Sequence, residues 1–387
     1  MKIKLLAAVL CLVLMFLSTS VCAFAAETAP TLGEALELGC VSAVLMEAET
    51  GTVLYEKNAD EALPPASVTK IMTLLLVMEA IDSGTLKWDD TVTASAHATS
   101  MGGSQIYLKE GEQMTVEDMV KSVVIASAND AAVALAEHIA GSEEVFVARM
   151  NARAKELGMN NTNFENTNGL DDTAENHVIS ARDIAIMSRE LIKHKKILEY
   201  SSTWMDSVRN GEFGLTNTNR LVRFYKGCTG LKTGSTSRAK FCISATAERD
   251  GMSLIAVIMA SPSRDERNEA AKTLLDWGYA NYELCRITPK IPGSLPITGG
   301  EKEFCKIFAQ DFCSVLPKGS ASKISIETNI SEKLTAPIPK GQKVGTLKYK
   351  LGNDIIGEME VVSSEDVEKI GFFGVLKNIF AYFLLRK

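Results

Sequence analysis

The chain has 387 residues, of which 46% are hydrophobic and 23% are charged, a composition typical of globular proteins with room for more than one domain. Its formal net charge is −7, and the sequence contains no basic stripe. This balance argues against nucleic acid as a partner.

The N-terminus has the pattern of a secretory signal peptide. Lys2 and Lys4 precede the apolar run Leu5–Leu17, and an Ala-x-Ala cleavage site ends at Ala25. The apolar run is shorter than the roughly 20 residues that a membrane-spanning helix needs. We therefore predict a signal peptide over residues 1–25 and an exported mature protein.

Residues 26–284 are predicted to form one domain of mixed α/β (α+β) class. Period-two alternation over 42–60 predicts one β-hairpin, and two strand-like segments, 240–248 and 253–261, predict a second around Arg-Asp-Gly at 249–251. Apolar residues recur at helical spacing in five further stretches, which are 66–80, 116–140, 144–157, 180–194 and 264–283. Strands near both ends of this region, with helices between them, predict one sheet with an inserted helical lobe.

The composition changes after residue 284. Residues 285–300 carry three prolines and three glycines, which predicts a linker between domains. Residues 301–364 contain short strand-like segments and few helix signals, so we predict a small all-β C-terminal domain.

The last segment, residues 365–387, is predicted to be an amphipathic helix. At about 100° per residue, the apolar side chains between Phe372 and Leu384 share one broad face, and the chain ends on Arg386 and Lys387. The run is too short to span a bilayer comfortably, so a helix lying in the membrane interface is expected, with the membrane surface as partner. The alternative is a helix packed on its own domain.

Six cysteines lie outside the predicted signal peptide, namely Cys40, Cys228, Cys242, Cys285, Cys305 and Cys313. Their spacing is irregular, and the four histidines are scattered, so we predict no metal site and no cofactor. Export permits disulfides, and this spacing is compatible with free thiols and with one or two bridges.

Three short motifs occur in an order that indicates one chemistry. Ser67 and Lys70 stand three positions apart at the start of a predicted helix, so their side chains share a face. Ser-Ala-Asn at 127–129 interrupts the second predicted helix, and Lys-Thr-Gly at 232–234 precedes a predicted strand. The order S-x-x-K, S-x-N and K-T-G is the signature of penicillin-recognising serine enzymes.

The chain further resembles the low-molecular-weight penicillin-binding proteins, the D-alanyl-D-alanine carboxypeptidases of the peptidase S11 family. The resemblance is carried by PPASVTKIMT, MGGSQIYLKEGE, ASANDAAVALAE, NTNGLDD, TNTNRLV, GLKTGST and RNEAAKTLLDWG. It covers residues 30–283 closely and the β-domain and terminal helix in outline, and it implies a serine β-lactamase/transpeptidase-like catalytic fold. One departure is Thr229, where an aspartate is common in the family.

The resemblance implies catalytic roles for three residues. Ser67 would attack the carbonyl of the penultimate D-alanine in a peptidoglycan stem peptide ending in D-Ala-D-Ala, and form an acyl-enzyme. Lys70 would act as the base, since burial and the nearby cation of Lys232 would lower its pKa. Ser127 would pass the proton to the leaving amine. β-Lactam antibiotics would acylate Ser67 by the same route and inhibit the enzyme.

The resemblance also implies a site for the terminal carboxylate of the substrate. Lys232 and the Thr233 hydroxyl would receive it, together with Arg267, although an arginine in such a polar helix turn is more often solvated. Gly234 would let the substrate backbone lie against the strand edge.

Two further groups would hold the scissile peptide. Asn129 would bind the substrate amide and Lys70. The backbone N–H groups of Ser67 and Ser235 would form the oxyanion hole.

The resemblance further implies a protein attached peripherally to the outer face of the bacterial cytoplasmic membrane. Three alternatives to the carboxypeptidase remain open at this point: a transpeptidase, a β-lactamase, and a non-catalytic module that senses β-lactams or binds the cell wall. His177 suggests a Ser-His-Asp triad, but the chain lacks a G-x-S-x-G elbow, so we interpret His177 as structural.

Overall fold

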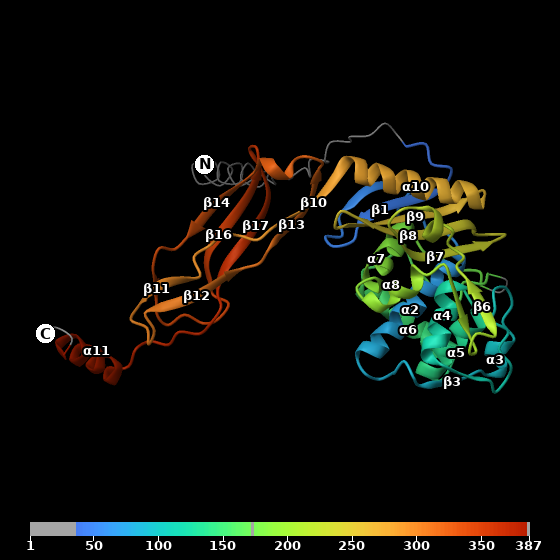
Figure 1. The fold of residues 1–387 in the computed structure, drawn as a ribbon, viewed down its shortest axis with the longest axis horizontal. Coiled ribbons are helices and arrows are strands. Elements are labelled where there is room, and N and C mark those ends of the chain that lie inside the picture. Colours follow the sequence, from blue (N-terminus) through green and yellow to red (C-terminus); the bar gives the residue numbers. More distant parts are fainter. Residues whose placement is uncertain (1–35, 172–173, 385–387) are drawn as a thin grey trace, which may run out of the picture. The chain divides into compact units, whose positions relative to one another are not determined.

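The computed structural model describes residues 36–171 and 174–384 (Figure 1). The predicted signal peptide and the last three residues of the predicted terminal helix lie outside these ranges. Both predicted hairpins of the first domain are present, and they belong to one antiparallel sheet with the strand order β2-β1-β9-β8-β7. Its strands are β1 Ser42–Glu47, β2 Val53–Lys57, β7 Cys228–Thr236, β8 Lys240–Arg249 and β9 Met252–Ser261.

Both faces of this sheet are covered by helices (Figure 1). Helix α10, Arg264–Asn281, packs on one face, and α7, Ala181–Leu191, packs on the other. The central strands β8 and β9 are therefore buried over most of their length, which explains why they read as nearly continuous apolar runs instead of alternating ones.

The helical lobe is inserted between β2 and β7, as predicted. Several of its helices begin where a Ser or Thr side chain accepts a hydrogen bond from the first turn, as Thr115, Ser142 and Ser180 do. Besides α7, its helices are η1 Ala66–Thr69, α2 Lys70–Asp82, α3 Ala96–Thr99, α4 Val116–Ile125, α5 Asn129–Ala140, α6 Glu143–Glu156, α8 Lys195–Ser201 and α9 Leu221–Phe224. Short two-stranded sheets join β3 Thr91–Thr93 to β4 Gln113–Thr115 and β5 Met205–Val208 to β6 Phe213–Thr216.

Helix α2 runs through the middle of the lobe. Most of its residues are buried, and it packs against α5, α6 and α7. A helix that is apolar on nearly all sides is stable only when enclosed. This enclosure fixes the position of the residues at its N-terminus, where Lys70 begins the helix.

The second domain is all β. A six-stranded sheet has the order β14-β16-β17-β12-β11-β15, and β10 pairs with β13 in a separate ladder. Residues 285–300, predicted as a linker, contain the end of β10 and all of β11, where Pro296 stands opposite Phe304. The strands are β10 Tyr282–Ile287, β11 Ser294–Thr298, β12 Phe304–Ala309, β13 Phe312–Pro317, β14 Ile324–Ile330, β15 Leu334–Thr335, β16 Lys343–Leu351 and β17 Asp354–Ser363, with the short helix η2 at Ala321–Lys323.

The chain continues into α11, Phe372–Leu384, within the segment predicted to be helical. Among the described residues, no helix combines the length and hydropathy needed to cross a membrane. All six cysteines outside the predicted signal peptide are free thiols.

Candidate active site

Ser67 lies in η1, the short 3-10 helix that leads directly into α2. Ala66, directly before Ser67, has a φ of +48°, a left-handed conformation that is unusual for a residue with a side chain. Ser67 is partly exposed, whereas Lys70 is fully buried. Lys70 Nζ lies 2.8 Å from Ser67 Oγ, so the structure forms the contact that the S-x-x-K spacing predicts.

The environment of Lys70 favours its neutral form. Burial lowers its pKa well below the usual value, the charge of Lys232 lowers it further, and the Asp130 carboxylate opposes the shift. A neutral amine beside a hydroxyl can accept the hydroxyl proton, which is the property required of a base.

Ser127 occupies the break between α4 and α5, also with a positive φ, of +64°. Its hydroxyl accepts a hydrogen bond of 2.8 Å from Lys232 Nζ. Lys232, on β7, is buried, and its pKa is lowered to about 7, first by burial and then by the charge of Arg267. The S-x-N and K-T-G motifs therefore meet through one hydrogen bond.

The strand that carries Lys232 passes directly beside the nucleophile turn. A β-carbon at Gly234 would lie 2.8 Å from the backbone nitrogen of Ser67, closer than packed atoms approach, so this position requires glycine. Thr233, one residue earlier, is buried and donates a hydrogen bond of 2.8 Å to Thr218 Oγ1. Ser235, one residue later, is exposed at the same edge.

Arg267 is buried, although the polar segment around it suggests an exposed helix turn. Its Nε and Nη2 both donate to Asn268 Oδ1, at 3.1 and 2.8 Å, which fixes the guanidinium. Its Nη1 donates to the carbonyl of Cys242, the β8 residue that pairs with Gly234, so Arg267 lies close to the K-T-G segment.

Asn129 Nδ2 donates to the Gly102 carbonyl at 2.7 Å, and not to Lys70 as expected. Its Oδ1 is buried and, among the described residues, has no hydrogen-bond partner. A buried acceptor without a partner carries a free-energy cost, and it suits the N–H group of a bound peptide.

Three contacts of this site were missed from the sequence. Asn168 O accepts a 2.7 Å hydrogen bond from Lys70 Nζ. A β-carbon on Gly169 would lie 1.9 Å from Ala66 O. The Asp130 carboxylate accepts hydrogen bonds from Ile106 N–H and Leu108 N–H, and so holds a neighbouring loop. The Asn- and Gly-rich composition of 160–172 was the available sequence signal for a functional loop. The contacts themselves use main-chain atoms, which every residue type supplies, so they leave no pattern in the sequence.

His177 is buried and does not contact Ser67. It forms hydrogen bonds with Thr69 Oγ1 and with the backbone N–H of Glu165 instead. These contacts agree with the interpretation of His177 as structural. Thr229, at the position where an aspartate is common, donates to Thr246 Oγ1 at 2.8 Å. No three His, Cys, Asp or Glu residues come together as a metal site within the described part of the chain.

A family model described as D-alanyl-D-alanine carboxypeptidase, peptidase S11, matches residues 27–263. The chain belongs to the peptidase S11 family. A second model, for the C-terminal domain of penicillin-binding protein 5, matches residues 290–369 of this S11 chain. The chain is 44% identical over 344 residues to the D-alanyl-D-alanine carboxypeptidase DacF of Bacillus subtilis, covering 87% of this chain and 88% of that protein.

Solved structures agree with this assignment. Penicillin-binding protein 5 from Haemophilus influenzae superposes on this S11 chain with a TM-score of 0.77 at 32% identity, covering 87% of this chain and all of that one. Penicillin-binding protein D2 from Listeria monocytogenes, in its ampicillin-bound form, matches with a TM-score of 0.59 at 32% identity, over 64% of this chain and all of that one. The predicted family and fold class are confirmed, and the chain is a serine-type carboxypeptidase of the penicillin-binding class.

Proposed function

We propose that this protein removes the terminal D-alanine from peptidoglycan stem peptides through an acyl-enzyme on Ser67. The observation that carries the proposal is the 2.8 Å contact between Ser67 Oγ and the buried, pKa-lowered amine of Lys70. Lys70 takes the hydroxyl proton, and Ser67 Oγ bonds to the carbonyl carbon of the penultimate D-alanine.

Breakdown of the tetrahedral intermediate then cleaves the C–N bond. The terminal D-alanine leaves as an amine after it accepts a proton through Ser127. The Ser127 hydroxyl is hydrogen-bonded to Lys232. Water hydrolyses the ester and restores Ser67. The backbone N–H groups of Ser67 and Ser235 bind the oxyanion, because Gly234 holds the two segments in contact.

The substrate ends in a carboxylate, and the site supplies three groups for it. Lys232 and Arg267 contribute positive charge, and Thr233 contributes a hydroxyl. All three are buried, Lys232 and Thr233 on β7 and Arg267 on α10. Charged hydrogen bonds are strongest where water is excluded. The unpaired Oδ1 of Asn129 accepts from the substrate amide.

The test is release of D-alanine from a synthetic peptide ending in D-Ala-D-Ala, by the purified full chain and by Ser67→Ala. Release by the wild type alone supports the proposal. A folded wild type that releases none, yet forms a covalent penicillin adduct, would overturn it in favour of an acyl-transferring transpeptidase or a sensor. A penicillin adduct that hydrolyses rapidly would favour a β-lactamase.

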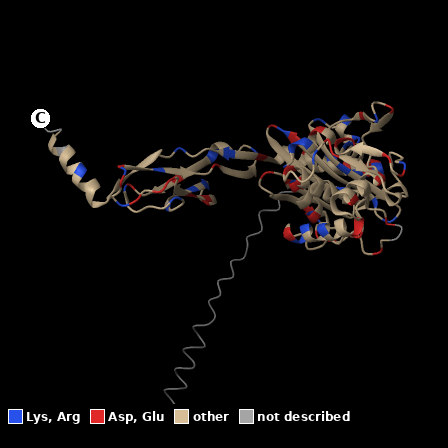
Figure 2. Cartoon of the chain, turned by 90° about the horizontal axis from the view of Figure 1, so that it is seen from below, with Lys and Arg blue, Asp and Glu red and all other residues tan. Residues whose placement is uncertain are grey.

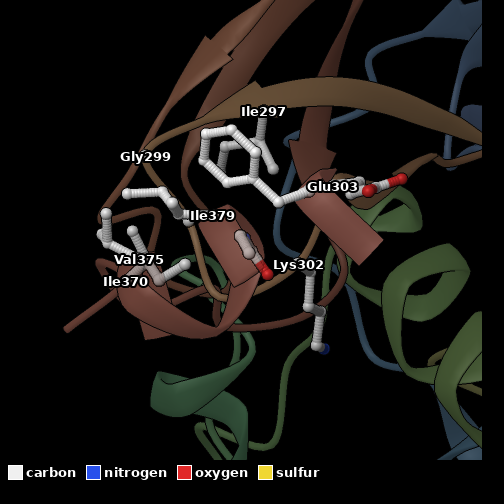
Figure 3. Close-up of a pocket in the computed structure, with 10 residues that line it drawn as sticks. Ile297, Gly299, Lys302, Glu303, Ile370, Val375 and Ile379 are labelled. Atoms are coloured by element: carbon white, nitrogen blue, oxygen red, sulfur yellow. The ribbon is translucent and has the colours of Figure 1, made fainter. Parts of the chain in front are cut away.

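We also propose that the protein is exported and is held at the outer face of the cytoplasmic membrane by α11. Figure 2 shows this helix almost free of charged residues. Val375 and Ile379 line a hollow that they share with Ile297 of β11 and with Ile370, which lies just before α11 (Figure 3). Other apolar side chains stay exposed, including Phe373 at 82% and Phe380 at 60%. A helix docked only on its own domain leaves these side chains in water, whereas a membrane interface covers them.

Co-sedimentation with phospholipid vesicles tests this proposal. The wild type and Phe304→Glu, which changes an exposed phenylalanine of the β-domain, are expected to pellet with vesicles. Phe373→Glu/Phe380→Glu is expected to remain in solution. A wild type that stays in the supernatant would refute membrane attachment by α11.

A further inference from the structure

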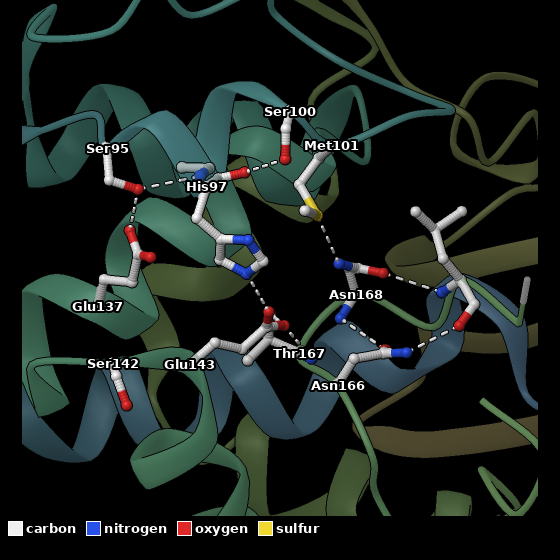
Figure 4. A network of polar contacts seen from close by, with 12 residues as sticks. Ser95, His97, Ser100, Met101, Glu137, Ser142, Glu143, Asn166, Thr167 and Asn168 are labelled. Carbon is white, nitrogen blue, oxygen red and sulfur yellow. Dashed lines mark hydrogen bonds and ion pairs between the residues drawn. The ribbon is translucent and has the colours of Figure 1, made fainter. Parts of the chain in front are cut away.

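The amine of Lys70 is held on its far side by a carbonyl from a distant turn. Asn168 O accepts its hydrogen bond at 2.7 Å. The turn is closed by its own side chains, because Asn166 Oδ1 accepts from Gly169 N–H at 2.7 Å and Asn168 Oδ1 accepts from Leu170 N–H at 2.8 Å (Figure 4). The place of the carbonyl therefore depends on where this turn is attached to the rest of the lobe.

Glu143 makes that attachment. Its Oε1 accepts two hydrogen bonds from Thr167, one from the backbone N–H at 2.9 Å and one from Oγ1 at 2.7 Å. Thr167 is fully buried, and its carbonyl accepts from Thr73 Oγ1 on α2 at 2.6 Å. Hydrogen bonds to a carboxylate are about twice as strong as neutral ones. The same carboxylate also stands at the first residue of α6, where the helix dipole favours negative charge.

The second carboxylate oxygen has a different partner. Glu143 Oε2 lies 2.7 Å from His97 Nε2, on a side chain that is 48% exposed. Because both oxygens are engaged, the carboxylate has one fixed orientation. Figure 4 shows the resulting series of contacts, which runs from His97 at the surface through Glu143 and Thr167 to Asn168.

We infer that Glu143 is a positioning residue for the reaction, because its carboxylate holds Thr167 so that the Asn168 carbonyl keeps the Lys70 amine within reach of the Ser67 hydroxyl. Glu143 touches neither Ser67 nor Lys70 and acts through two neighbouring residues. The inference rests on the role proposed above for Lys70 as base.

The experiment compares Glu143→Gln with Glu144→Gln in the full chain. Glu144 is the next residue of the same helix turn, is exposed, and has no contact with Thr167 in the structure, so the two variants lose the same charge at the same helix end. The readouts are the rate constant for acylation of Ser67 by a fluorescent penicillin and the dissociation constant that precedes acylation. Glu143→Gln is expected to slow acylation about tenfold at an unchanged dissociation constant. Glu144→Gln is expected to stay within about twofold of the wild type.

A double-mutant cycle tests whether the effect passes through Thr167. Thr167→Val removes the Oγ1 hydrogen bond and is expected to slow acylation, with a combined effect in Glu143→Gln/Thr167→Val smaller than the product of the single ones. Thr167→Ser keeps the hydroxyl and is expected to restore the wild-type rate. Wild-type acylation by folded Glu143→Gln, or independent effects in the cycle, would overturn the inference. Failure of the base assignment is separate, since it would appear as normal acylation by Lys70→Arg.

Discussion

His177 Nε2 lies 2.7 Å from Thr69 Oγ1, two residues beyond the nucleophile Ser67. The backbone N–H of Glu165 donates a hydrogen bond to His177 Nδ1 at 3.0 Å. The imidazole proton is therefore on Nε2, which donates a hydrogen bond to Thr69 Oγ1. Thr69 Oγ1 in turn donates to the Ala66 carbonyl at 2.8 Å. This imidazole therefore connects Glu165, in the 160–171 loop, through Thr69 to the strained residue Ala66 that precedes Ser67.

The neutral state of His177 predicts how stability changes with pH. Burial lowers its pKa from 6.5 to about 4, so between these values the unfolded chain binds the proton and the folded chain does not. Stability is then lost as the pH falls from 6.5 towards 4. His177→Gln is expected to reduce the loss in unfolding free energy between pH 7.5 and 4.5 by about 2 kcal/mol, measured by urea denaturation.

His97 provides a control of opposite sign. Its hydrogen bond to Glu143 raises its pKa, and the carboxylates of Glu137 and Glu144 also face it. Its contribution to stability is therefore present below its unfolded pKa and is lost as the pH rises through its folded pKa. His97→Gln should steepen the acid-induced loss that His177→Gln flattens. Equal slopes in both variants and the wild type would contradict the two assignments.

Gly169 is predicted to be intolerant of any side chain. A β-carbon there would meet backbone atoms, 1.9 Å from Ala66 O and 2.3 Å from Ala66 C, at a φ of +86°. Gly84 has a similar φ of +75° with nothing within 4 Å, so Gly84→Ala measures the backbone cost alone, about 1 kcal/mol. Gly169→Ala is expected to cost a further 1–3 kcal/mol, roughly, in urea denaturation and to abolish penicillin labelling. Similar losses for both variants would show that the turn can move away from Ala66.

Arg267 is predicted to set the alkaline limit of activity. Burial lowers the pKa of Lys232 to about 7 with help from the charge of Arg267, and Lys232 binds the substrate carboxylate when protonated. The value of kcat/KM is therefore expected to fall as the pH rises past about 7, since kcat/KM reports the free enzyme. In Arg267→Gln the alkaline fall in kcat/KM should move to higher pH. Arg264 is an exposed arginine on the same helix, and Arg264→Gln should move this fall less. A fall at an unchanged pH would assign the titration to a group other than Lys232.

Lys70→Arg separates the charge of Lys70 from its basicity. Arginine keeps a positive charge but does not deprotonate in proteins, so it cannot accept the Ser67 proton. Acylation by penicillin is expected to slow by about 100-fold or more. Stopped-flow fluorescence of the labelled protein gives this rate, and circular dichroism checks the fold.

The features that could be predicted from the sequence are those with a local, periodic pattern. Alternation located the first hairpin, two apolar strand-like segments around a turn located the second, and the spacing of Ser67 and Lys70 placed both on one face of a helix turn. The sequence could not place the Asn168 carbonyl, which meets Lys70 across 98 residues through main chain that any residue could supply. Arg267 was read as a weak candidate because its neighbours are polar, although β8 buries it. Pro296 suggested a linker, whereas β11 accommodates this proline opposite Phe304.

The groups of the site come from η1, the start of α2, the α4–α5 break, β7 and the 166–170 turn, so no single element contains the site. A chain that has formed its helices but has not docked them on the sheet has normal helical content and no nucleophile. Covalent penicillin labelling therefore counts only molecules that have completed folding. The antibiotic can serve as a titrant of native protein in refolding mixtures, where circular dichroism also counts partly assembled chains.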